Sequence, residues 1–406
     1  MTAEALRRGE EAGRRLSLVY AATFFEMGVQ IPFLPVWLGA RGLTDDQIAI
    51  ILAAPLAVRV VATPAIAALA DRRGDVAGTL TASAIVLASC CALIGFLSGF
   101  TPLLIVTSAL ACTQGLVIPL SDALTASVLR AREDGAGGLD YGRIRKWGSA
   151  AYIAGNLFGG LYLAFFSIDK LTILLTIAAL IGVAACLHAA PLGAGASNLK
   201  AAAVDPAETR ALGLLPLVIA GAALINASHG LLNTFGSLHW ARESHSGAFV
   251  GAAWAIGVVC EILVFAVAGR WFSGPNSAFA MLATGGGTAM LRWLVMASDP
   301  ASAPLLLVQS AHGLTFALTH LGSMQFIFAN APARMRARAQ GWLSASIAGC
   351  SAIVVFLGGP LYAHLGEIAY VPMAGLAAAG LAIILFAATI RMRQARQARQ
   401  GRHGAI

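Results

Sequence analysis

The sequence predicts an all-α integral membrane protein with twelve transmembrane helices in two pseudo-symmetric six-helix halves. Apolar residues make up 58% of its 406 residues and charged residues only 11%, against about 25% in soluble domains. The mean hydropathy is +0.78. Such a chain cannot cover itself with polar side chains, so a soluble globular enzyme is excluded. The apolar residues also form stretches long enough for membrane-spanning helices, and polar residues occur at matching positions in the two halves of the chain.

Each predicted span is a stretch of about 20 mostly apolar residues, the length that an α-helix needs to cross a bilayer. Their continuous apolarity differs from the alternating pattern of a transmembrane β-barrel. The first span follows a charged segment and is too long for a signal-peptide core, so we expect it to be retained as a helix. The spans of the first half lie near 16–39, 46–70, 76–98, 101–129, 144–167 and 170–190. Those of the second half lie near 211–238, 247–271, 277–297, 302–330, 338–362 and 367–390.

Basic residues predict the orientation. With a cytoplasmic N-terminus, 22 of the 27 Lys and Arg fall on the cytoplasmic side and 3 on the outer side, as the positive-inside rule requires. We expect a multi-pass protein of the cell (inner) membrane with both termini in the cytoplasm. The expected organisation is a six-helix bundle over 1–190, a cytoplasmic linker over 191–210, a second bundle over 211–391 and a basic tail over 392–406. The tail lacks aromatic stacking partners, which favours contact with anionic lipid over nucleic-acid binding.

Polar residues of one half match polar residues of the other at a nearly constant offset. A random apolar sequence would match Leu and Gly easily, but not ionisable groups inside apolar spans. The pattern therefore indicates an internal repeat, the usual construction of secondary transporters. The matched pairs are Glu26 and His229, Gln30 and Asn233, and Trp37 and Trp240, each 203 residues apart, and Gln114 and His312, 198 apart.

Ionisable side chains inside the spans are candidate functional groups, because each costs about 2.5–3.5 kcal/mol at membrane depth. An acid or a histidine can carry a coupling proton, whereas arginine holds an anion or neutralises an acid. A polar stripe on the seventh span should face a cavity or make interhelical hydrogen bonds. Arg59 could instead form a static ion pair with Glu261. The candidates for substrate binding and proton coupling are Glu26, Gln30, Asp122, Asn226, His229, Asn233, Glu261, Arg292, His312 and His320.

Several segments resemble known transporters. The loop Ala67-x-x-x-Asp71-Arg72-Arg73-Gly74 is similar to the G-x-x-x-D-R-x-G-R-R loop of the major facilitator superfamily. The segment DYGRIRKWGS over 140–149 resembles the phenylpropionate permease family within it, as do 119–124, Glu261, Arg292-Trp293, and His312 with His320. A more distant similarity, at Gly142-Arg143-x-Arg145, Glu261, Arg292 and His312, is to lactose-permease-type sugar–proton symporters. In that family a Glu three residues after the histidine carries the proton, and this chain has Thr315 there.

The resemblance implies the fold of the major facilitator superfamily, with Glu261 and Arg292 flanking a central cavity. It implies an aromatic carboxylate such as a phenylpropionate as the substrate, with a sugar or a nucleoside next. Gating or structural roles are expected for Arg59, Asp71, Arg72, Gly74, Arg143 and Arg145.

The predicted function is secondary active transport, as proton-coupled symport of a small organic solute by alternating access. No G-x-x-x-x-G-K-[ST], H-E-x-x-H or G-x-S-x-G motif occurs, so neither an ATP-driven pump nor an intramembrane enzyme is expected. Export of a drug or metabolite by proton antiport stays open, as does a non-transporting membrane sensor or scaffold. We expect a monomer with no cofactor and no metal, since His312 and His320 lack a third ligand at zinc-binding spacing. The expected partners are the solute, the proton and the lipid bilayer, not nucleic acid.

Overall fold

The computed structural model describes residues 3–58, 75–130, 141–193, 213–274, 276–332 and 335–403, and these residues form helices with no strand among them. The predicted all-helical membrane fold is confirmed. The helices of the first half are α1 (Ala3–Ala40), an unlabelled helix over 45–58, α3 (Val76–Ile94), α4 (Phe100–Arg130), α5 (Tyr141–Phe165) and α6 (Leu171–Ala189). The short 3-10 turns η1 (Ile168–Lys170) and η2 (Ala190–Gly193) flank α6.

The second half contains two spans that are broken by π-helical turns. The seventh span consists of α8 (Leu215–Ala227), the π turn η4 (Leu232–Gly236) and α9 (Ser237–Arg242). The tenth consists of α12 (Ser302–Ser310), the π turn η5 (Gly313–Ala317) and α13 (Leu318–Asn330). The other elements are α10 (Gly247–Trp271), α11 (Ser277–Met296), α14 (Arg336–Leu365), the 3-10 turn η7 (Gly366–Ala369) and α15 (Tyr370–His403).

A helix lies in every one of the twelve predicted spans, although the second span is described only over 46–58. Among the described residues, seven stretches are long and apolar enough to cross a membrane, and the last of them, Arg338–Gln394, covers both α14 and α15. Large apolar side chains are exposed, among them Phe96, Phe165 and Leu307 at 87%, 77% and 74%. In a bilayer this surface contacts lipid tails instead of water.

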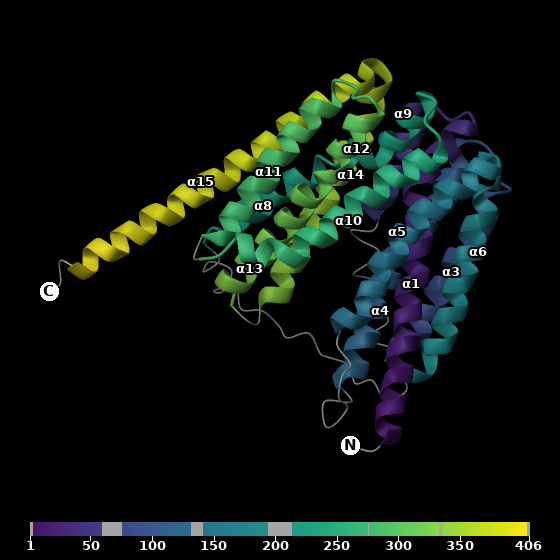
Figure 1. Ribbon diagram of the computed structural model, residues 1–406, viewed down its shortest axis with the longest axis horizontal. Coiled ribbons are helices and arrows are strands. Elements are labelled where there is room, and N and C mark those ends of the chain that lie inside the picture. Colours follow the sequence, from purple (N-terminus) through teal and green to yellow (C-terminus); the bar gives the residue numbers. More distant parts are fainter. Residues whose placement is uncertain are drawn as a thin grey trace. The chain divides into compact units, whose positions relative to one another are not determined.

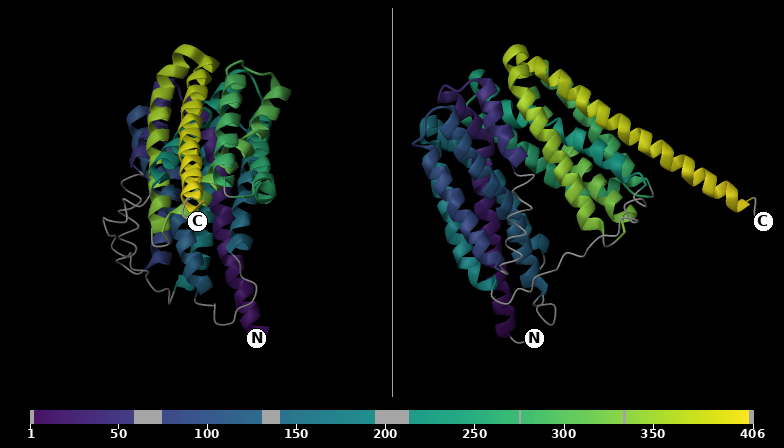
Figure 2. Two further views of the ribbon diagram at one scale, coloured as in Figure 1. Left: turned by 90° about the vertical axis from the view of Figure 1, so that its left-hand side faces the viewer. Right: turned by 180° about the vertical axis from the view of Figure 1, so that it is seen from behind.

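The chain forms two compact units. Unit 1 comprises residues 1–201 and 233–255, and unit 2 comprises residues 202–232 and 256–406. In unit 1, helices α1, α3, α4, α5 and α6 run side by side (Figure 1). In unit 2, helices α8, α11, α13, α14 and α15 do the same, and both arrangements can be followed in the views of Figure 2. The expected linker and bundle boundaries stay predictions, because residues 194–212 lie outside the described part of the chain.

Glycine brings α1 and α5 of unit 1 into backbone contact. A Cβ atom on Gly28 would lie 2.4 Å from the carbonyl oxygen of Tyr152, and one on Gly155 would lie 2.4 Å from that of Phe25. No larger residue fits such a crossing without moving a helix. Because the two helices touch, the polar side chains of α1 are held at fixed positions inside the unit.

Glycine has the same effect beside the tenth span in unit 2. A Cβ atom on Gly313 would lie 2.5 Å from the carbonyl oxygen of Cys260, so η5 packs directly on the backbone of α10. A Cβ atom on Gly257 would approach the Cβ of His312 to 3.3 Å. The neighbouring residues of these two elements, including Glu261, are therefore forced close together.

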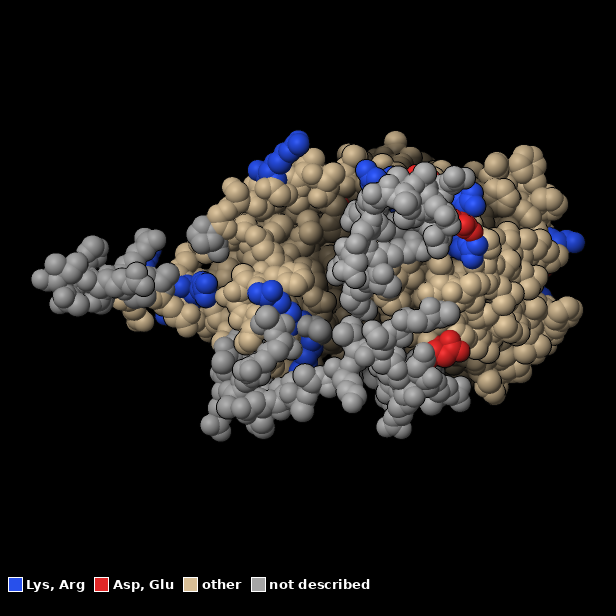
Figure 3. All heavy atoms as spheres, turned by 90° about the horizontal axis from the view of Figure 1, so that it is seen from below, with Lys and Arg blue, Asp and Glu red and all other residues tan. Residues whose placement is uncertain are grey.

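Charge is unevenly distributed over the surface. On the face that Figure 3 shows, the charged side chains of the described residues are mostly Lys and Arg. Such a basic face suits the cytoplasmic side of a membrane protein. The orientation itself stays a prediction.

Candidate functional site

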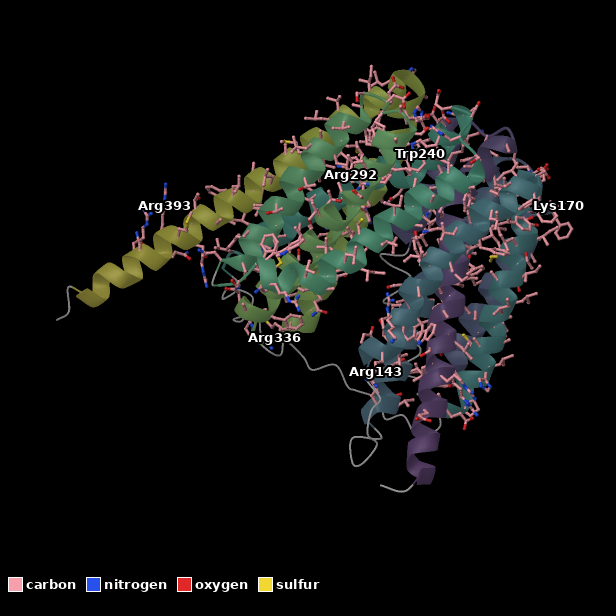
Figure 4. All side chains as sticks on the ribbon, in the orientation of Figure 1. Arg143, Lys170, Trp240, Arg292, Arg336 and Arg393 are labelled. Carbon is pink, nitrogen blue, oxygen red and sulfur yellow. The ribbon has the colours of Figure 1, made fainter. Side chains whose placement is uncertain are left out.

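Arg292 of α11, which Figure 4 labels, is the centre of a buried polar cluster in unit 2. Only 3% of its surface is exposed. Its Nη2 donates a hydrogen bond of 2.7 Å to Gln309 Oε1, and its Nη1 lies 3.3 Å from His312 Nδ1 and 3.4 Å from Thr315 Oγ1. Its Nε has no hydrogen-bond partner among the described residues. No carboxylate of the described chain lies within ion-pairing distance of it.

His312 connects this guanidinium to an acid. Its Nδ1 must accept from Arg292 Nη1, because a guanidinium can only donate. The neutral ring then carries its proton on Nε2, which lies 3.6 Å from Glu261 Oε2 of α10. The side chains of Glu261 and His312 are 20% and 21% exposed, so this end of the cluster is wetter than Arg292. The cluster therefore runs from a buried cation, through a histidine, to a half-buried carboxyl.

His229 joins the cluster from the seventh span. Its Nδ1 lies 3.2 Å from the carbonyl oxygens of Ile225 and Asn226, so this nitrogen is the donor. Its Nε2 is then an acceptor and lies 2.9 Å from Thr315 Oγ1. Thr315 is fully buried and links His229 to the Arg292 guanidinium.

Aromatic rings, above all that of Trp293, pack against the hydrogen-bonded cluster around Arg292. The Arg292 guanidinium lies over the Trp293 ring, 4.7 Å from its centre, although the two residues are neighbours in sequence. Trp293 donates from Nε1 to Ser228 Oγ at 2.8 Å, meets the His229 ring edge-on at 5.0 Å and stacks on Tyr370 at 5.8 Å. Trp293 is thereby fixed by three neighbours and holds the guanidinium in place.

The two π turns lie next to the histidines of the cluster. Around His229, side chains occupy backbone carbonyls that a regular helix would use, since Ser228 Oγ donates to Ile225 O and His229 Nδ1 to Ile225 O or Asn226 O. Such local bonds compete with α-helical hydrogen bonding. The helix therefore loosens after Ala227 and widens into η4, and η5 begins directly after His312. π turns of this kind are frequent at functional sites.

Unit 1 contains a separate buried cluster around Glu26 of α1. Gln114 of α4 donates from Nε2 to Glu26 Oε2 at 3.0 Å and also to Gln30 Oε1. Cys91 Sγ of α3 lies 4.0 Å from Glu26 Oε1. All four residues are buried.

Asp122 of α4 lies in a third polar cluster, also in unit 1. Its Oδ1 accepts hydrogen bonds from Tyr20 at 2.5 Å and from Tyr141 at 2.9 Å. The Arg145 guanidinium lies over the rings of Phe24 and Tyr20, at 4.1 and 5.6 Å from their centres. Asp122 is half-buried and held by two phenols.

Comparison with known proteins identifies the class. The model of the MFS_1 like family matches residues 14–371. The chain belongs to the MFS_1 like family, within the major facilitator superfamily. It is 28% identical over 377 residues to a probable 3-phenylpropionic acid transporter of Escherichia coli (strain K12), covering 88% of this chain and 93% of that protein. The predicted likeness to phenylpropionate permeases is confirmed, and this MFS_1 like protein is a transporter and not an enzyme.

Solved structures show the same fold. The crystal structure of the nucleoside transporter NupG matches with a TM-score of 0.77 at 14% identity, over 93% of this chain and 98% of that one. A peptide transporter, POT, solved with sulfate, matches with a TM-score of 0.72 at 14% identity, over 94% of each chain. At such identities the likeness concerns the fold alone. This fold agrees with a multi-pass membrane protein.

The predicted site residues of this MFS_1 like transporter fall into separate places. The structure brings Glu261, Arg292 and His312 together with His229, and it brings Glu26 together with Gln30. Of the remaining candidates, Asp122 lies with its tyrosines and Asn233 is exposed. The Asn226 side chain bonds to Ala222 O of its own helix, while its carbonyl oxygen faces His229, and His320 is exposed and stacked on Phe316. Asn233 lies within the π turn η4, and its side chain is exposed, so the polar stripe facing a cavity stays a prediction.

The predicted gating residues are only partly described. Arg59, Asp71, Arg72 and Gly74 lie outside the described residues. Arg143 is exposed, and Arg145 packs on aromatic rings. The ion pair considered between Arg59 and Glu261 stays a prediction.

Sequence reasoning missed several members of the clusters. Gln309 and Thr315 were not candidates, although they flank His312 at three-residue spacing and share its helix face. Ser228 was missed because a serine beside a histidine in an apolar span gives no separate signal. Gln114 belongs to the internal repeat, but nothing in the sequence connects it to Glu26.

Proposed function

We propose that this transporter is a proton-coupled symporter of small organic anions, with an aromatic carboxylate such as a phenylpropionate as its substrate. The observation that carries the proposal is Arg292, a buried guanidinium without a carboxylate of any described residue in ion-pairing distance. An uncompensated buried charge costs several kcal/mol, and a bound carboxylate would supply the missing charge. The relative named as a probable 3-phenylpropionic acid transporter supports the same substrate class.

The donors of Arg292 support carboxylate binding. A guanidinium offers five N–H groups in a planar fork that matches the two oxygens of a carboxylate. Gln309, His312 and Thr315 surround the Nη atoms, and Nε is unpaired within the described residues. Neutral partners orient the fork without cancelling its charge. A lysine at this position would keep the charge and lose the bidentate geometry.

Rings next to the guanidinium support a ring-bearing substrate. Phe316 stacks on the His312 ring with centroids 5.5 Å apart, and Trp293 lies under the guanidinium. An aromatic acid could place its carboxylate at Arg292 and its ring against Phe316, which is half-buried. Aromatic pairs of this kind contribute about 0.5–1.5 kcal/mol beyond the area that they bury.

Proton coupling follows from charge balance. A carboxylate bound at Arg292 neutralises the guanidinium, so the loaded site carries no net charge only when the nearby acid is protonated. Glu261 beside His312, Glu26 and Asp122 are the acids that could take the proton. The loaded site would then carry substrate and proton as a neutral pair and face the two sides of the inner membrane in turn.

The test measures binding and flux with purified protein. In detergent, 3-phenylpropionate is titrated against its uncharged amide, a sugar and a nucleoside, with wild type, Arg292→Lys, Arg292→Gln and the control Arg270→Gln. Arg270 is an exposed arginine in the last turn of α10. We expect the acid alone to bind, with Kd raised about tenfold or more, ~1.4 kcal/mol, in Arg292→Gln, less in Arg292→Lys, and unchanged in Arg270→Gln.

In proteoliposomes, an inward proton gradient should drive accumulation of the acid. Accumulation driven only by the opposite gradient would indicate export by antiport, and binding without flux would indicate a sensor. Equal binding of the acid and its amide, or normal binding by Arg292→Gln, would contradict the assignment of Arg292.

A further inference from the structure

Glu26 lies in one of the most completely enclosed polar clusters of unit 1. It is 2% exposed, and the other members, Gln30, Gln114 and Cys91, are 7%, 8% and 1% exposed. The cluster is built from three helices, since α1 supplies Glu26 and Gln30, α3 supplies Cys91 and α4 supplies Gln114. The Gly28–Gly155 crossing, two residues along α1 from both Glu26 and Gln30, holds α1 in place. The carboxyl group therefore has fixed neighbours.

These neighbours provide too few donors for an ionised carboxylate. An amide nitrogen has two N–H donors, and Gln114 uses one for Glu26 Oε2 and one for Gln30 Oε1. The second oxygen, Oε1, faces the thiol of Cys91 at 4.0 Å, and a thiol is a weak donor. A carboxylate accepts up to about four hydrogen bonds. One hydrogen bond from Gln114 and one weak contact with the Cys91 thiol are enough for a neutral carboxylic acid instead.

No cation of the described residues forms an ion pair with Glu26. The titratable groups that the contacts of the described residues place beside this part of α1 are the thiols of Cys91 on α3 and Cys186 on α6, and Tyr152 on α5, whose backbone faces Gly28. Near Glu26, α4 contributes the uncharged Gln114. An isolated ion in such surroundings would carry a desolvation cost of several kcal/mol, so the group binds a proton instead.

A small cavity adjoins the carboxyl group. Its volume is about 20 Å³, and Thr23, Glu26, Leu87, Gly182 and Cys186 are among its lining residues. That volume is enough for about one water molecule. Water reaching this cavity could accept the proton of Glu26 and give it up again.

We propose that Glu26 is a proton-binding site of this transporter, occupied by a proton in the conformation described and held in position by Gln114, whose amide Gln30 orients. The role of Glu26 in transport rests on the proposed symport, in which Glu26 would be the acid that binds the coupling proton. Glu26 belongs to unit 1 and is not part of the Arg292 cluster of unit 2. Because Gln114 donates to Oε2, the proton lies on Oε1. Release would leave a carboxylate that only a wetter environment can stabilise.

The first test needs no substrate. Infrared difference spectroscopy of the reconstituted wild-type protein at neutral and alkaline pH records the C=O stretching band of protonated carboxyl groups. We expect a band that disappears in Glu26→Gln and persists in Glu243→Gln, a matched change at an exposed residue. Gln114→Leu keeps Glu26 and removes its best donor, so the band should persist at higher frequency. A band unchanged in Glu26→Gln and unshifted in Gln114→Leu would overturn the proposal.

The second test connects the proton to transport. In proteoliposomes, Glu26→Gln should retain exchange of 3-phenylpropionate across the membrane and lose accumulation driven by the proton gradient, whereas Glu243→Gln keeps both. Gradient-driven accumulation retained in Glu26→Gln would overturn the coupling role. If wild type carries no aromatic acid at all, the proposed substrate is wrong, and the infrared band still decides whether Glu26 binds a proton.

Discussion

Replacing Thr315 by valine should show whether a single hydroxyl positions Arg292. Thr315 Oγ1 lies 2.9 Å from His229 Nε2 and 3.4 Å from Arg292 Nη1, and the residue is fully buried. Valine has nearly the same shape without the hydroxyl, so the change removes hydrogen bonds and leaves little cavity. His229 Nε2 then loses its partner, and one Nη atom of Arg292 loses one of its two neighbours.

The expected magnitude follows from the groups left without partners. A buried acceptor deprived of its donor costs about 1–3 kcal/mol, and contacts to charged groups lie in the upper part of that range. If part of this loss appears as misorientation of the guanidinium, each 1.4 kcal/mol raises Kd for the carboxylate about tenfold. We therefore expect Thr315→Val to lower thermal stability in detergent and to weaken binding of 3-phenylpropionate by about tenfold.

Thr319→Val is the matched control for this experiment. Thr319 lies one turn further along, is equally buried, and donates its hydroxyl to Thr315 O of its own helix at 2.6 Å. Removing a hydroxyl that bonds only within its own helix costs little. Differential scanning fluorimetry and binding isotherms compare the two variants. Equal losses in both, or normal binding by Thr315→Val, would refute the role given to this hydroxyl.

Two further predictions concern a helix contact and an ion pair of unit 1, and the control residue Gly269 lies in unit 2. Gly160→Ala should destabilise the protein, because its Cβ would lie 2.3 Å from Gly247 O, whereas Gly269→Ala meets nothing within 4 Å and should be neutral or stabilising by up to about 1 kcal/mol. Thermal unfolding in detergent compares the two, and equal melting temperatures would contradict the predicted close contact. Asp45→Asn breaks the pair in which Arg242 donates to Asp45 at 2.7 and 3.1 Å. This pair is partly exposed, so the loss should be about 1 kcal/mol or less and shrink with added salt; a loss insensitive to salt would argue for a buried pair.

Much of the fold follows from the sequence, because the spans depend on local apolarity. Every predicted span contains a helix, since about 20 consecutive apolar residues allow no other structure in a bilayer. The π turns could not be predicted in this way. They arise where side chains such as Ser228 and His229 take backbone carbonyls, and periodicity reasoning assumes a regular helix. For this reason the position of Asn233 relative to His229 does not follow from a regular helical repeat.

The sequence was enough to predict which residues belong to the candidate site, but not which of them contact one another. The cost of a charge in hydrocarbon is enough to single out Glu26, Glu261 and Arg292 from the sequence. Which groups meet depends on contacts between helices far apart in sequence, as between Gln114 and Glu26, 88 residues away. No local sequence pattern contains that information. The need for glycine at position 313 likewise follows only from the structure, in which the backbone of Cys260 packs against it.

The Arg292 cluster lacks a negative charge and the Glu26 cluster lacks a positive charge. This difference favours a transport role over a purely structural one. Among the described residues, Arg292 is a cation without an acid in reach, and Glu26 is an acid without a cation. A bundle selected only for stability would pair such charges or replace them with apolar residues, because an apolar replacement is often neutral or stabilising. In the proposed mechanism, an anion bound at Arg292 and a proton bound at Glu26 would remove both costs. Loading both ligands would then leave the two clusters uncharged, which is the condition that symport of a carboxylate with a proton requires.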